Sequence, residues 1–306
     1  MRRRAIVIGA GLAGSSAAER LAARGWTIEL IERADAPAQG ASGNLAGVLR
    51  PLPSVDDNRL ARLTRAGFLE ACRHFASLTA AGLPLRWAQT GVLHLARDDT
   101  HAATQQRVVD VQQPAADYLR FVDRGEASQL AGWPVTHGGW WFPGGGWVDP
   151  ASLCRANIAR HAVAIKAHYG CRVAEVERRA GLWRAYADGG AVIAEAPVLI
   201  LANATDAGRF AVAAHLPLRA ARGQVSHLPA AAGSAPDIVV CRLGYVTPAI
   251  DGLRCAGATF SIDDGETALR TADHAENLAR LDFILPGHAK GIQPADLGGR
   301  VGFRPL

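Results

Sequence analysis

The sequence lacks the cysteine patterns that build disulfide frameworks or zinc sites. Its five cysteines are scattered along the chain, are odd in number and include no C-x-x-C pair. Because this usage is typical of a reducing compartment, we expect a cytoplasmic protein. No apolar stretch approaches the roughly 18 to 20 residues that cross a bilayer, so the sequence argues against an integral membrane protein and we expect no membrane partner.

The signature motifs of several enzyme classes are also missing. The chain contains no H-E-x-x-H and no G-x-S-x-G sequence, and no third ligand accompanies His161 and His168. We therefore expect no metal and no serine hydrolase site. The sequence also shows no internal repeat and no recognised RNA-binding module, and nothing in it specifies an oligomeric state.

Lysine is almost absent, since Lys166 and Lys290 are the only two among 33 basic residues. The 28 acidic residues leave a formal net charge of +5, which permits a polyanionic partner without demanding one. Hydrophobic residues make up 49% and charged residues 20% of the chain, a balance that excludes an intrinsically disordered protein. Its 306 residues suffice for two domains or one large α/β unit.

The N-terminal segment carries a dinucleotide-binding pattern of strand, glycine turn and helix. The apolar residues 5–8 predict a strand, and residues 15–24 have the composition of a helix. Between them, Gly9 would make the tight turn, Gly11 would let the backbone approach a pyrophosphate, and Gly14 would let the helix pack closely on the strand. The pyrophosphate would lie at the helix N-terminus.

A second strand and an acidic residue complete this pattern. Residues 26–31 predict a strand, and Glu32 follows at its end, where a carboxylate can bind the ribose hydroxyls of an adenosine. The acid disfavours a ribose phosphate, and hence NADP, but does not distinguish NAD from FAD. Arg33, directly after it, weakens even this exclusion.

A second glycine-rich loop follows at residues 40–47, and two such loops suit a long ligand. With both loops, the sequence resembles the FAD-dependent oxidoreductases of the D-amino-acid oxidase and glycine oxidase superfamily. Their flavin is threaded between the first βαβ unit and a following loop of this kind, so the resemblance implies FAD as the cofactor. The alternative interpretation is a flexible surface turn, because Gly, Ser and Asn are turn formers.

The resemblance covers the whole chain and is most specific at Ala41-Ser42-Gly43-Asn44, with Gly47 soon after. This stretch is similar to the flavin oxidase half of the MnmC family, bifunctional enzymes of tRNA wobble-uridine modification. In that family the flavin half removes a carboxymethyl group from carboxymethylaminomethyl-uridine, and a separate half methylates the product. The resemblance implies that this chain performs only the oxidation.

The resemblance also implies a set of cofactor contacts in the two loops and the strands beside them. The expected contacts are Gly9, Gly11, Leu12, Ala13, Gly14, Glu32, Arg33, Ala41, Ser42, Gly43, Asn44, Gly47, Val48, Val173, Ala202 and Asn203. The turn at residues 202–204 reads Ala-Asn-Ala where the superfamily has Ala-x-Gly. This departure removes the conformational freedom of the missing glycine.

Flavin catalysis depends on substrate positioning more than on reactive side chains, because a hydride passes from the carbon beside an amine to the flavin. An arginine fork suits a substrate carboxylate. In glycine oxidase-like enzymes the anchoring arginine lies in a Gly-x-Arg-Pro motif, assisted by a tyrosine of a Tyr-x-x-Pro motif. These motifs match residues 302–305 and 245–248, so the resemblance implies Arg304 and Tyr245 as the catalytic residues. Without it, Arg304 would be interpreted as a solvated or structurally paired charge.

The predicted fold class is α/β, with a Rossmann-like FAD-binding domain interleaved with a substrate domain built on a mixed or antiparallel sheet. We expect residues 1–82, 145–215 and 300–306 in the FAD-binding domain, and residues 83–144 and 216–299 in the substrate domain. Asp149 and Pro150 begin a helix that is expected to reach about Ala167.

Three functions remain open at this point. The chain is a tRNA-modifying oxidase, a small-amine or amino-acid oxidase of the glycine or sarcosine oxidase type, or a truncated, non-catalytic flavoprotein. The third hypothesis arises because the resembled proteins continue past Gly-x-Arg-Pro with a loop, a strand and a helix that close over the flavin, whereas this sequence ends at Leu306. It predicts weak or absent flavin, or a longer natural protein.

Overall fold

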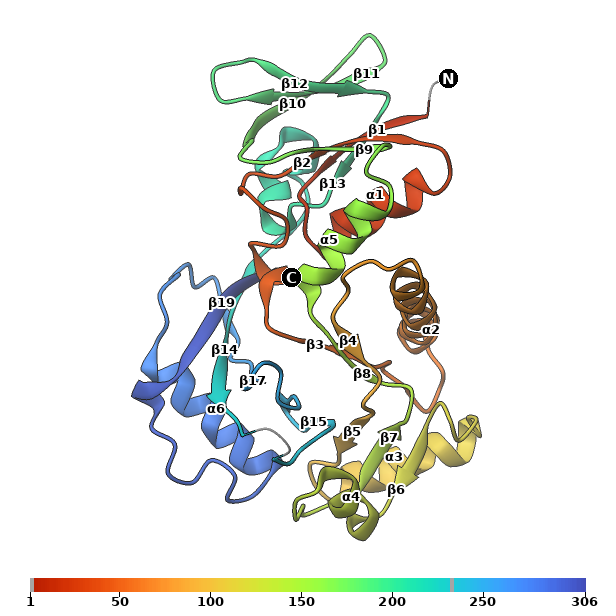
Figure 1. Cartoon of the computed structure of the whole chain (residues 1–306), viewed down its shortest axis with the longest axis vertical. Coiled ribbons are helices and arrows are strands. Elements are labelled where there is room, and N and C mark those ends of the chain that lie inside the picture. Colours follow the sequence, from red (N-terminus) through yellow and green to blue (C-terminus); the bar gives the residue numbers. More distant parts are fainter. Residues whose placement is uncertain (1–2, 232–233) are drawn as a thin grey trace.

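Four sheets organise the computed structural model, which describes residues 3–231 and 234–306. Residues 1, 2, 232 and 233, which belong to predicted domain segments, lie outside the described residues. Figure 1 shows a smaller upper part with the N-terminal strands and a larger lower part that holds most of the strands after β13. None of the helices in the described ranges is long and apolar enough to cross a membrane.

The upper part is built on a four-stranded parallel sheet with the order β13-β1-β2-β9. Its strands are β1 (Arg4–Ile8), β2 (Thr27–Ile31), β9 (Ile165–His168) and β13 (Val198–Leu201). Ala5 and Val7 pack toward helix α1 (Leu12–Ala22), with α5 (Pro150–Arg160) beside it. Ile6 and Ile8 pack on the opposite side, so β1 is buried on both faces as its apolar run predicts.

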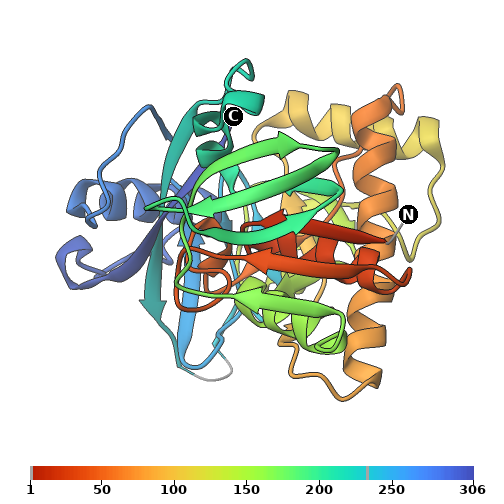
Figure 2. The ribbon, with the colours of Figure 1, turned by 90° about the horizontal axis from the view of Figure 1, so that it is seen from above.

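An antiparallel three-stranded sheet covers that opposite face, and Figure 2 shows it from above. Its strands are β10 (Val173–Arg179), β11 (Leu182–Ala187) and β12 (Val192–Ala196). Ala185, Ala194 and Ala196 meet the side chains of β1 in this interface. After β13 the chain forms the short turns η2 (Ala204–Arg209) and η3 (Ala211–Ala213).

The helix that was expected to reach about Ala167 is shorter. It begins as predicted, because the Asp149 carboxylate accepts hydrogen bonds from the N–H groups of Ala151 and Ser152. It ends at Arg160, however, and residues 165–168 form β9, which pairs in parallel with β2. The buried side chain of Ile165 and the pairing with β2 override the local helical composition, and neither is visible in the local sequence.

The lower part is built on a mixed sheet of nine strands with the order β18-β14-β17-β16-β15-β5-β7-β6, and β19 pairs with β14. The strands are β5 (Val92–Leu95), β6 (Arg120–Val122), β7 (Gly139–Phe142), β14 (Ala220–Pro229), β15 (Val239–Cys241), β16 (Tyr245–Val246), β17 (Leu253–Gly257), β18 (Ser261–Ile262) and β19 (Gly298–Pro305). Helices α4 (Arg124–Ala131) and α6 (Thr271–Ile284) share a buried core with one face of this sheet. Helix α3 (Asp99–Gln112) and the turn η4 (Pro294–Asp296) complete the lower part.

A small antiparallel sheet lies between the two parts in Figure 1. It consists of β3 (Gly47–Leu49), β8 (Gly146–Val148) and β4 (Trp87–Ala88), and helix α2 (Arg59–Ala80) packs against it through Phe75 and Leu78. The chain enters β3 from the turn η1 (Ala41–Gly43), so the second glycine-rich loop leads directly into this linking sheet.

The predicted α/β class with interleaved parallel and antiparallel sheets is confirmed. Residues Gly298–Pro305 form β19, which pairs along β14 in the large sheet. Residues 301–303 nevertheless border the cavity of the upper part. The predicted domain boundaries stay a prediction, and β19 contacts both parts of the molecule.

Candidate functional site

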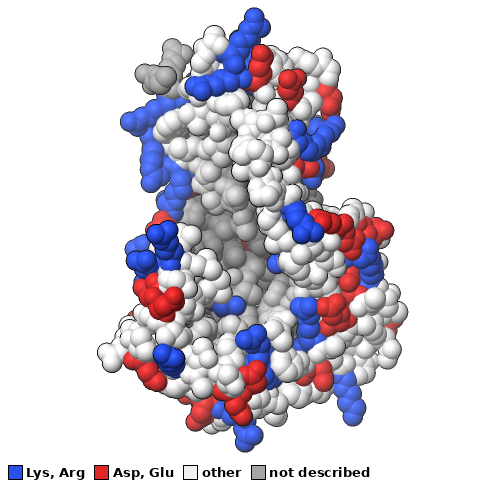
Figure 3. Space-filling view, turned by 180° about the vertical axis from the view of Figure 1, so that it is seen from behind, with Lys and Arg blue, Asp and Glu red and all other residues white. Residues whose placement is uncertain are grey.

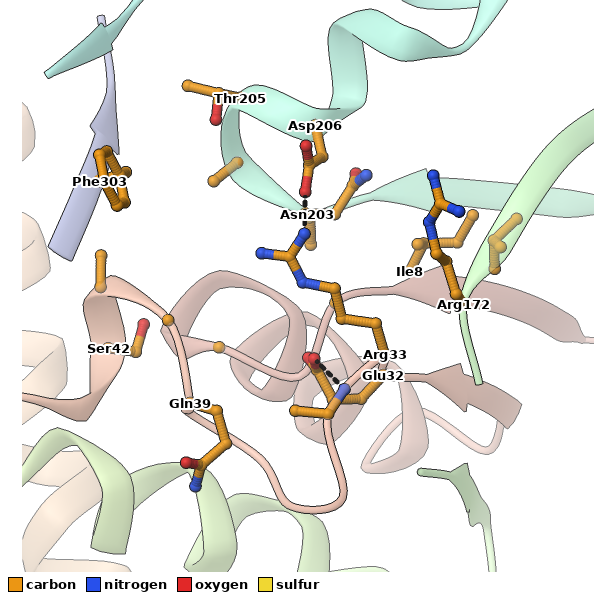
Figure 4. A pocket seen from close by; sticks show the side chains of 18 of the residues that line it. Ile8, Glu32, Arg33, Gln39, Ser42, Arg172, Asn203, Thr205, Asp206 and Phe303 are labelled. Carbon is orange, nitrogen blue, oxygen red and sulfur yellow. Dashed lines mark hydrogen bonds and ion pairs between the residues drawn. The ribbon is translucent and has the colours of Figure 1, made fainter. Parts of the chain in front are cut away.

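A cavity of about 380 Å³ lies where β1, β2 and β13 end. Figure 4 shows that its walls come from distant parts of the chain: the loops after these three strands, the segment before β10, and β19. The carboxyl ends of parallel strands are the usual place for a ligand in an open α/β sheet. In the space-filling view of Figure 3, the molecule is hollowed at mid-height, between its upper and lower parts.

Two glycines allow the close packing at the floor of this cavity. Gly9 has a φ of +100°, and a Cβ there would lie 2.6 Å from the carbonyl oxygen of Ala202. A Cβ on Gly14 would overlap the carbonyl oxygen of Gly9. Only glycine therefore lets α1 begin this close to the end of β1, which is the arrangement predicted from the motif.

The N-terminus of α1 faces the second glycine-rich loop. The helix begins after Gly11, which has no side chain to cap it, and the N–H of Leu12 donates to Ser42 Oγ at 3.1 Å. The first N–H groups of a helix have no partner within the helix, and they carry a partial positive charge. The two loops thus meet at a place that favours an anionic group such as a pyrophosphate.

The carboxylate of Glu32 is held at the end of β2 by the backbone. Its Oε2 accepts a hydrogen bond from the N–H of Ala10 at 2.7 Å, and its Oε1 accepts one from the N–H of Ala34 at 3.1 Å. Arg33, the next residue, reaches across the cavity and forms an ion pair with Asp206 of η2 (Figure 4). Both side chains of this ion pair border the cavity and remain partly exposed to solvent.

A buried amide oxygen next to η2 lacks a partner. Asn203 Oδ1 is buried and has no hydrogen-bond partner among the described residues, although Asn203 borders the cavity. A buried acceptor of this kind requires a donor, which a bound ligand can supply. The neighbouring Ala204 has a φ of +54°, the left-handed conformation that the superfamily's glycine would adopt without strain.

The cavity brings together many of the predicted cofactor contacts, but not all of them. Those that line it are Gly9, Gly11, Glu32, Arg33, Ala41, Ser42, Val173, Ala202 and Asn203. Those that do not line it are Leu12, Ala13, Gly14, Gly43, Asn44, Gly47 and Val48. The second group lies in the first turn of α1 and along the path from η1 into β3.

Sequence reasoning missed several residues of this cavity. They include Gln39, Arg172, Thr205, Asp206 and Phe303, which are labelled in Figure 4. None belongs to a recognised cofactor motif. Adjacency along the chain is the one signal that points to them, since Arg172 precedes Val173 and Asp206 follows Asn203 closely.

Arg304 and Tyr245 lie on the same face of the large sheet. Arg304 pairs with Ala221, whereas Tyr245 pairs with Gly257, which in turn pairs with Val225. Directly paired residues of antiparallel strands point to the same face, and side chains alternate along each strand. Since Ala221 and Val225 are four residues apart in β14, both predicted catalytic side chains emerge on one face.

Tyr245 is half-buried, and its hydroxyl lies 3.4 Å from Cys255 Sγ. Burial raises the pKa of Tyr245 well above its ordinary value and raises that of the Cys255 thiol to about 11. The nearby Arg304 acts in the opposite direction on the pKa of Tyr245, but burial dominates. The phenol is therefore neutral, and its hydroxyl can donate a hydrogen bond.

The Arg304 side chain is exposed and packs on an aromatic ring. Its guanidinium lies 5.2 Å from the centre of the Phe260 ring, and no carboxylate of the described residues lies within ion-pair distance. An exposed arginine without an acidic partner, held by an aromatic ring, can bind a carboxylate through its fork. Within the described ranges, no three His, Cys, Asp or Glu side chains are grouped so that they could hold a metal ion.

The strand-turn-helix unit, the acid at the end of β2 and the cavity beside them define a dinucleotide-binding protein of the Rossmann class. Residues 4–306 match the family model DAO, described as FAD dependent oxidoreductase, and the chain belongs to this family. FAD is the family's cofactor, so this result confirms the cofactor inferred from the two glycine-rich loops.

Comparison with curated proteins gives a more specific relationship. Over 303 residues the chain is 61% identical to the tRNA 5-methylaminomethyl-2-thiouridine biosynthesis bifunctional protein MnmC of Aromatoleum aromaticum. The alignment covers 99% of this chain and 48% of that protein, so the chain spans about half the length of the curated relatives it matches. The resemblance to the MnmC family is thereby confirmed.

Two solved structures show the same fold. Glycine oxidase from Bacillus cereus gives a TM-score of 0.81 at 18% identity, covering 100% of this chain and 83% of that one. Iminodiacetate oxidase from Chelativorans sp. gives a TM-score of 0.78 at 26% identity, covering 99% of this chain and 84% of that one.

Proposed function

We propose that this chain oxidises the C–N bond of a carboxymethylamine with FAD, and that its substrate is carboxymethylaminomethyl-uridine at the wobble position of tRNA. The observation that carries the chemistry is Arg304. It has no carboxylate partner among the described residues, and it shares a sheet face with the neutral hydroxyl of Tyr245. The two groups together offer a cation and a hydrogen-bond donor to a substrate carboxylate.

The residues around the cavity fit FAD. The backbone at Gly11 and the N-terminus of α1 would hold the pyrophosphate, with Ser42 beside it. Glu32 would bind the adenosine ribose, and the unpartnered Oδ1 of Asn203 would accept a hydrogen bond from the ligand. When bound, FAD supplies an acceptor for a hydride from the carbon beside the substrate amine.

The protein's own part in the reaction is to bind and orient the substrate. The Arg304 fork would take both carboxylate oxygens, which fixes the plane of the carboxymethyl group. The Tyr245 hydroxyl would donate a further hydrogen bond, since burial keeps the phenol protonated. Holding the carboxylate at two points leaves the adjacent carbon with one orientation, and such orientation is the main protein contribution in flavin catalysis.

The relationship to MnmC supports tRNA as the carrier of this substrate. The formal net charge of +5 is compatible with a polyanionic partner, and Figure 3 shows Lys and Arg side chains along the edges of the upper part. A tRNA substrate also supports our proposal that the protein acts in the cytoplasm.

A small-amine oxidase is the second candidate function. The 26% identity to an iminodiacetate oxidase favours it, because iminodiacetate is itself a secondary amine with two carboxymethyl groups. The same arginine and tyrosine would bind either substrate, since both present a carboxymethylamine. The two candidates differ in what the second substituent of the amine is, and a substrate comparison separates them.

The test is to incubate the FAD-loaded protein with tRNA that carries carboxymethylaminomethyl-uridine and to identify the nucleosides by mass spectrometry. We expect aminomethyl-uridine to appear, because loss of the hydride leaves an imine that water hydrolyses, and the former carboxymethyl group is released as glyoxylate. Arg304→Lys should raise the KM roughly tenfold, because lysine cannot replace a bidentate fork. Arg219→Lys is the matched control, since Arg219 is an exposed arginine beside the same sheet that pairs with Asp263.

Oxidation of iminodiacetate, glycine or sarcosine with unchanged tRNA would support the second candidate and contradict the first. A purified protein that holds no flavin and oxidises neither class would leave the non-catalytic alternative. The assignment of Arg304 as the carboxylate anchor requires that Arg304→Lys raises the KM and Arg219→Lys does not. If both variants behave alike, Arg304 is not the carboxylate anchor.

A further inference from the structure

A second arginine of β19 contacts the cofactor loop directly. Arg300 Nη2 donates to the carbonyl oxygens of Gln39 at 2.5 Å and Gly40 at 2.9 Å, across a separation of 261 and 260 residues. The Arg300 guanidinium has no carboxylate within ion-pair distance among the described residues. Its charge is therefore directed at the backbone of the second glycine-rich loop.

The loop is shaped to receive this side chain. A Cβ on Gly43 would overlap Arg300 Nη2 and would lie 2.5 Å from the carbonyl oxygen of Ala38. The missing side chain at Gly43 thus leaves the space that the guanidinium fills. Gly43, an expected cofactor contact, borders the arginine, and it does not line the cavity.

The same strand continues toward the proposed substrate anchor. Arg300, Gly302 and Arg304 alternate along β19 and so point to one face. A Cβ on Gly302 would lie 3.1 Å from the Cα of Ala41, so the strand abuts the loop there as well. The Cα atoms of Arg300 and Arg304 are on the order of 13 Å apart in an extended strand. Pairing along β14 holds this spacing.

The loop in turn contacts the helix that receives the pyrophosphate. Arg300 binds the carbonyls of Gln39 and Gly40, and Ser42 follows in the same loop. The Oγ of Ser42 accepts a hydrogen bond from the N–H of Leu12 at 3.1 Å. A continuous set of contacts therefore runs from β19 through the loop to the N-terminus of α1.

We propose that Arg300 is a positioning residue, which fixes the cofactor loop and hence FAD at a set distance from Arg304. The inference rests on the proposed function, because it takes FAD as the ligand and Arg304 as the anchor. Arg300 acts through the loop and does not touch the reacting atoms. Its role is to keep the cofactor loop at a fixed distance from Arg304 along β19, so that a substrate bound at Arg304 meets the flavin.

The test compares four variants of the full chain: Arg300→Ala, Arg300→Lys, Gly43→Ala and the double variant Arg300→Ala/Gly43→Ala. The FAD dissociation constant is measured by titration without substrate, at a temperature where each apoprotein is folded by circular dichroism. We expect Arg300→Ala to raise it roughly tenfold. Lysine can still donate to both carbonyls, so Arg300→Lys should restore most of the affinity.

Gly43→Ala should weaken FAD binding with Arg300 in place. The new methyl group would also crowd the Ala38 carbonyl, which is independent of Arg300. The double variant therefore isolates the part of the affinity loss that arises from the contact with Arg300. The added methyl group should cost less affinity in the Arg300→Ala background than in the wild type, because the space beside it is then empty. Additive effects would contradict the proposal.

A second readout does not involve the cofactor. Amide hydrogen exchange at Leu12 and residues 39–43 of the apoprotein should be faster in Arg300→Ala than in the wild type, whereas exchange in α6 should not change. If Arg300 only supports the fold, its loss lowers the melting temperature and leaves the FAD dissociation constant unchanged, and the proposal is overturned. A wild-type chain that binds no FAD would instead contradict the proposed function, and the exchange result would still decide the role of Arg300.

Discussion

Ser42 Oγ accepts a hydrogen bond from the N–H of Leu12 at 3.1 Å and so joins two glycine-rich segments. Each segment is recognisable in the sequence, but only the fold shows that they meet. Their junction lies at the N-terminus of α1, where a pyrophosphate is favoured by the helix dipole and by free N–H groups. The cofactor site is therefore one surface made from two motifs.

The Ser42 contact can be tested in the apoprotein. Replacing Ser42 with alanine removes the oxygen that satisfies the N–H of Leu12, which acts as a helix cap supplied from another segment. We expect the free energy of unfolding to fall by about 1 kcal/mol in urea titrations. Ser42→Thr keeps the hydroxyl and should lose less. Equal stability of the wild type and the alanine variant would show that the contact contributes nothing.

The carboxylate of Glu32 should be essential for FAD affinity. In Glu32→Gln an amide group faces the N–H of Ala10 or Ala34, so one backbone donor loses its acceptor. We expect the FAD dissociation constant to rise roughly tenfold or more, as titration of flavin fluorescence would show.

Glu29→Gln is the matched control for this change. Glu29 lies in β2, three residues before Glu32, but it pairs with His168 and does not line the cavity. Its substitution should leave FAD affinity unchanged. If the two variants bind FAD equally well, Glu32 is not a cofactor contact.

Ala204 occupies a conformation that suits glycine. Its φ of +54° destabilises an L-residue by about 1 to 2 kcal/mol. Glycine adopts this φ without strain, and its cost is the larger conformational entropy that the unfolded chain loses on folding. Ala204→Gly should therefore stabilise the protein by about 0.5 kcal/mol in urea unfolding. Ala214→Gly, at an ordinary φ of −63°, should have the opposite sign. Destabilisation by both substitutions would contradict the assigned backbone.

His94 should make stability depend on pH. Burial, together with the charges of Arg50, His101 and Arg97, lowers the pKa of His94 from 6.5 to about 3. As the pH falls below about 6.5, His94 binds a proton in the unfolded state but stays neutral in the folded state, so the free energy of unfolding decreases. His94→Phe should remove up to about 2 kcal/mol of the stability difference between pH 7 and pH 5. An unchanged pH dependence in urea unfolding would refute this assignment.

Local patterns account for what the sequence predicted correctly. The apolar run before Gly9, the glycine spacing and the acid after β2 are features of neighbouring residues, and each is found in the expected place. The helix of this unit begins at Leu12, earlier than the expected residue 15, because the glycine turn itself contributes the first helical residues.

Contacts between distant segments account for what the sequence did not predict. The Arg33–Asp206 bridge joins residues 173 positions apart, and Phe303 reaches the cavity from the last strand. The residues of β9 have the composition of a helix end, and their conformation as a strand depends on pairing with β2. Single-sequence patterns carry no information about such pairing, so the far walls of the cavity required the fold.

The most direct test of the central claim is anaerobic reduction of the protein's own flavin. The FAD-loaded chain is mixed, without oxygen, with tRNA that carries carboxymethylaminomethyl-uridine, and the absorbance of oxidised flavin is followed. We predict that this absorbance disappears in proportion to the aminomethyl-uridine formed. Flavin that stays oxidised with this tRNA, or a chain that retains no flavin at all, would contradict the account.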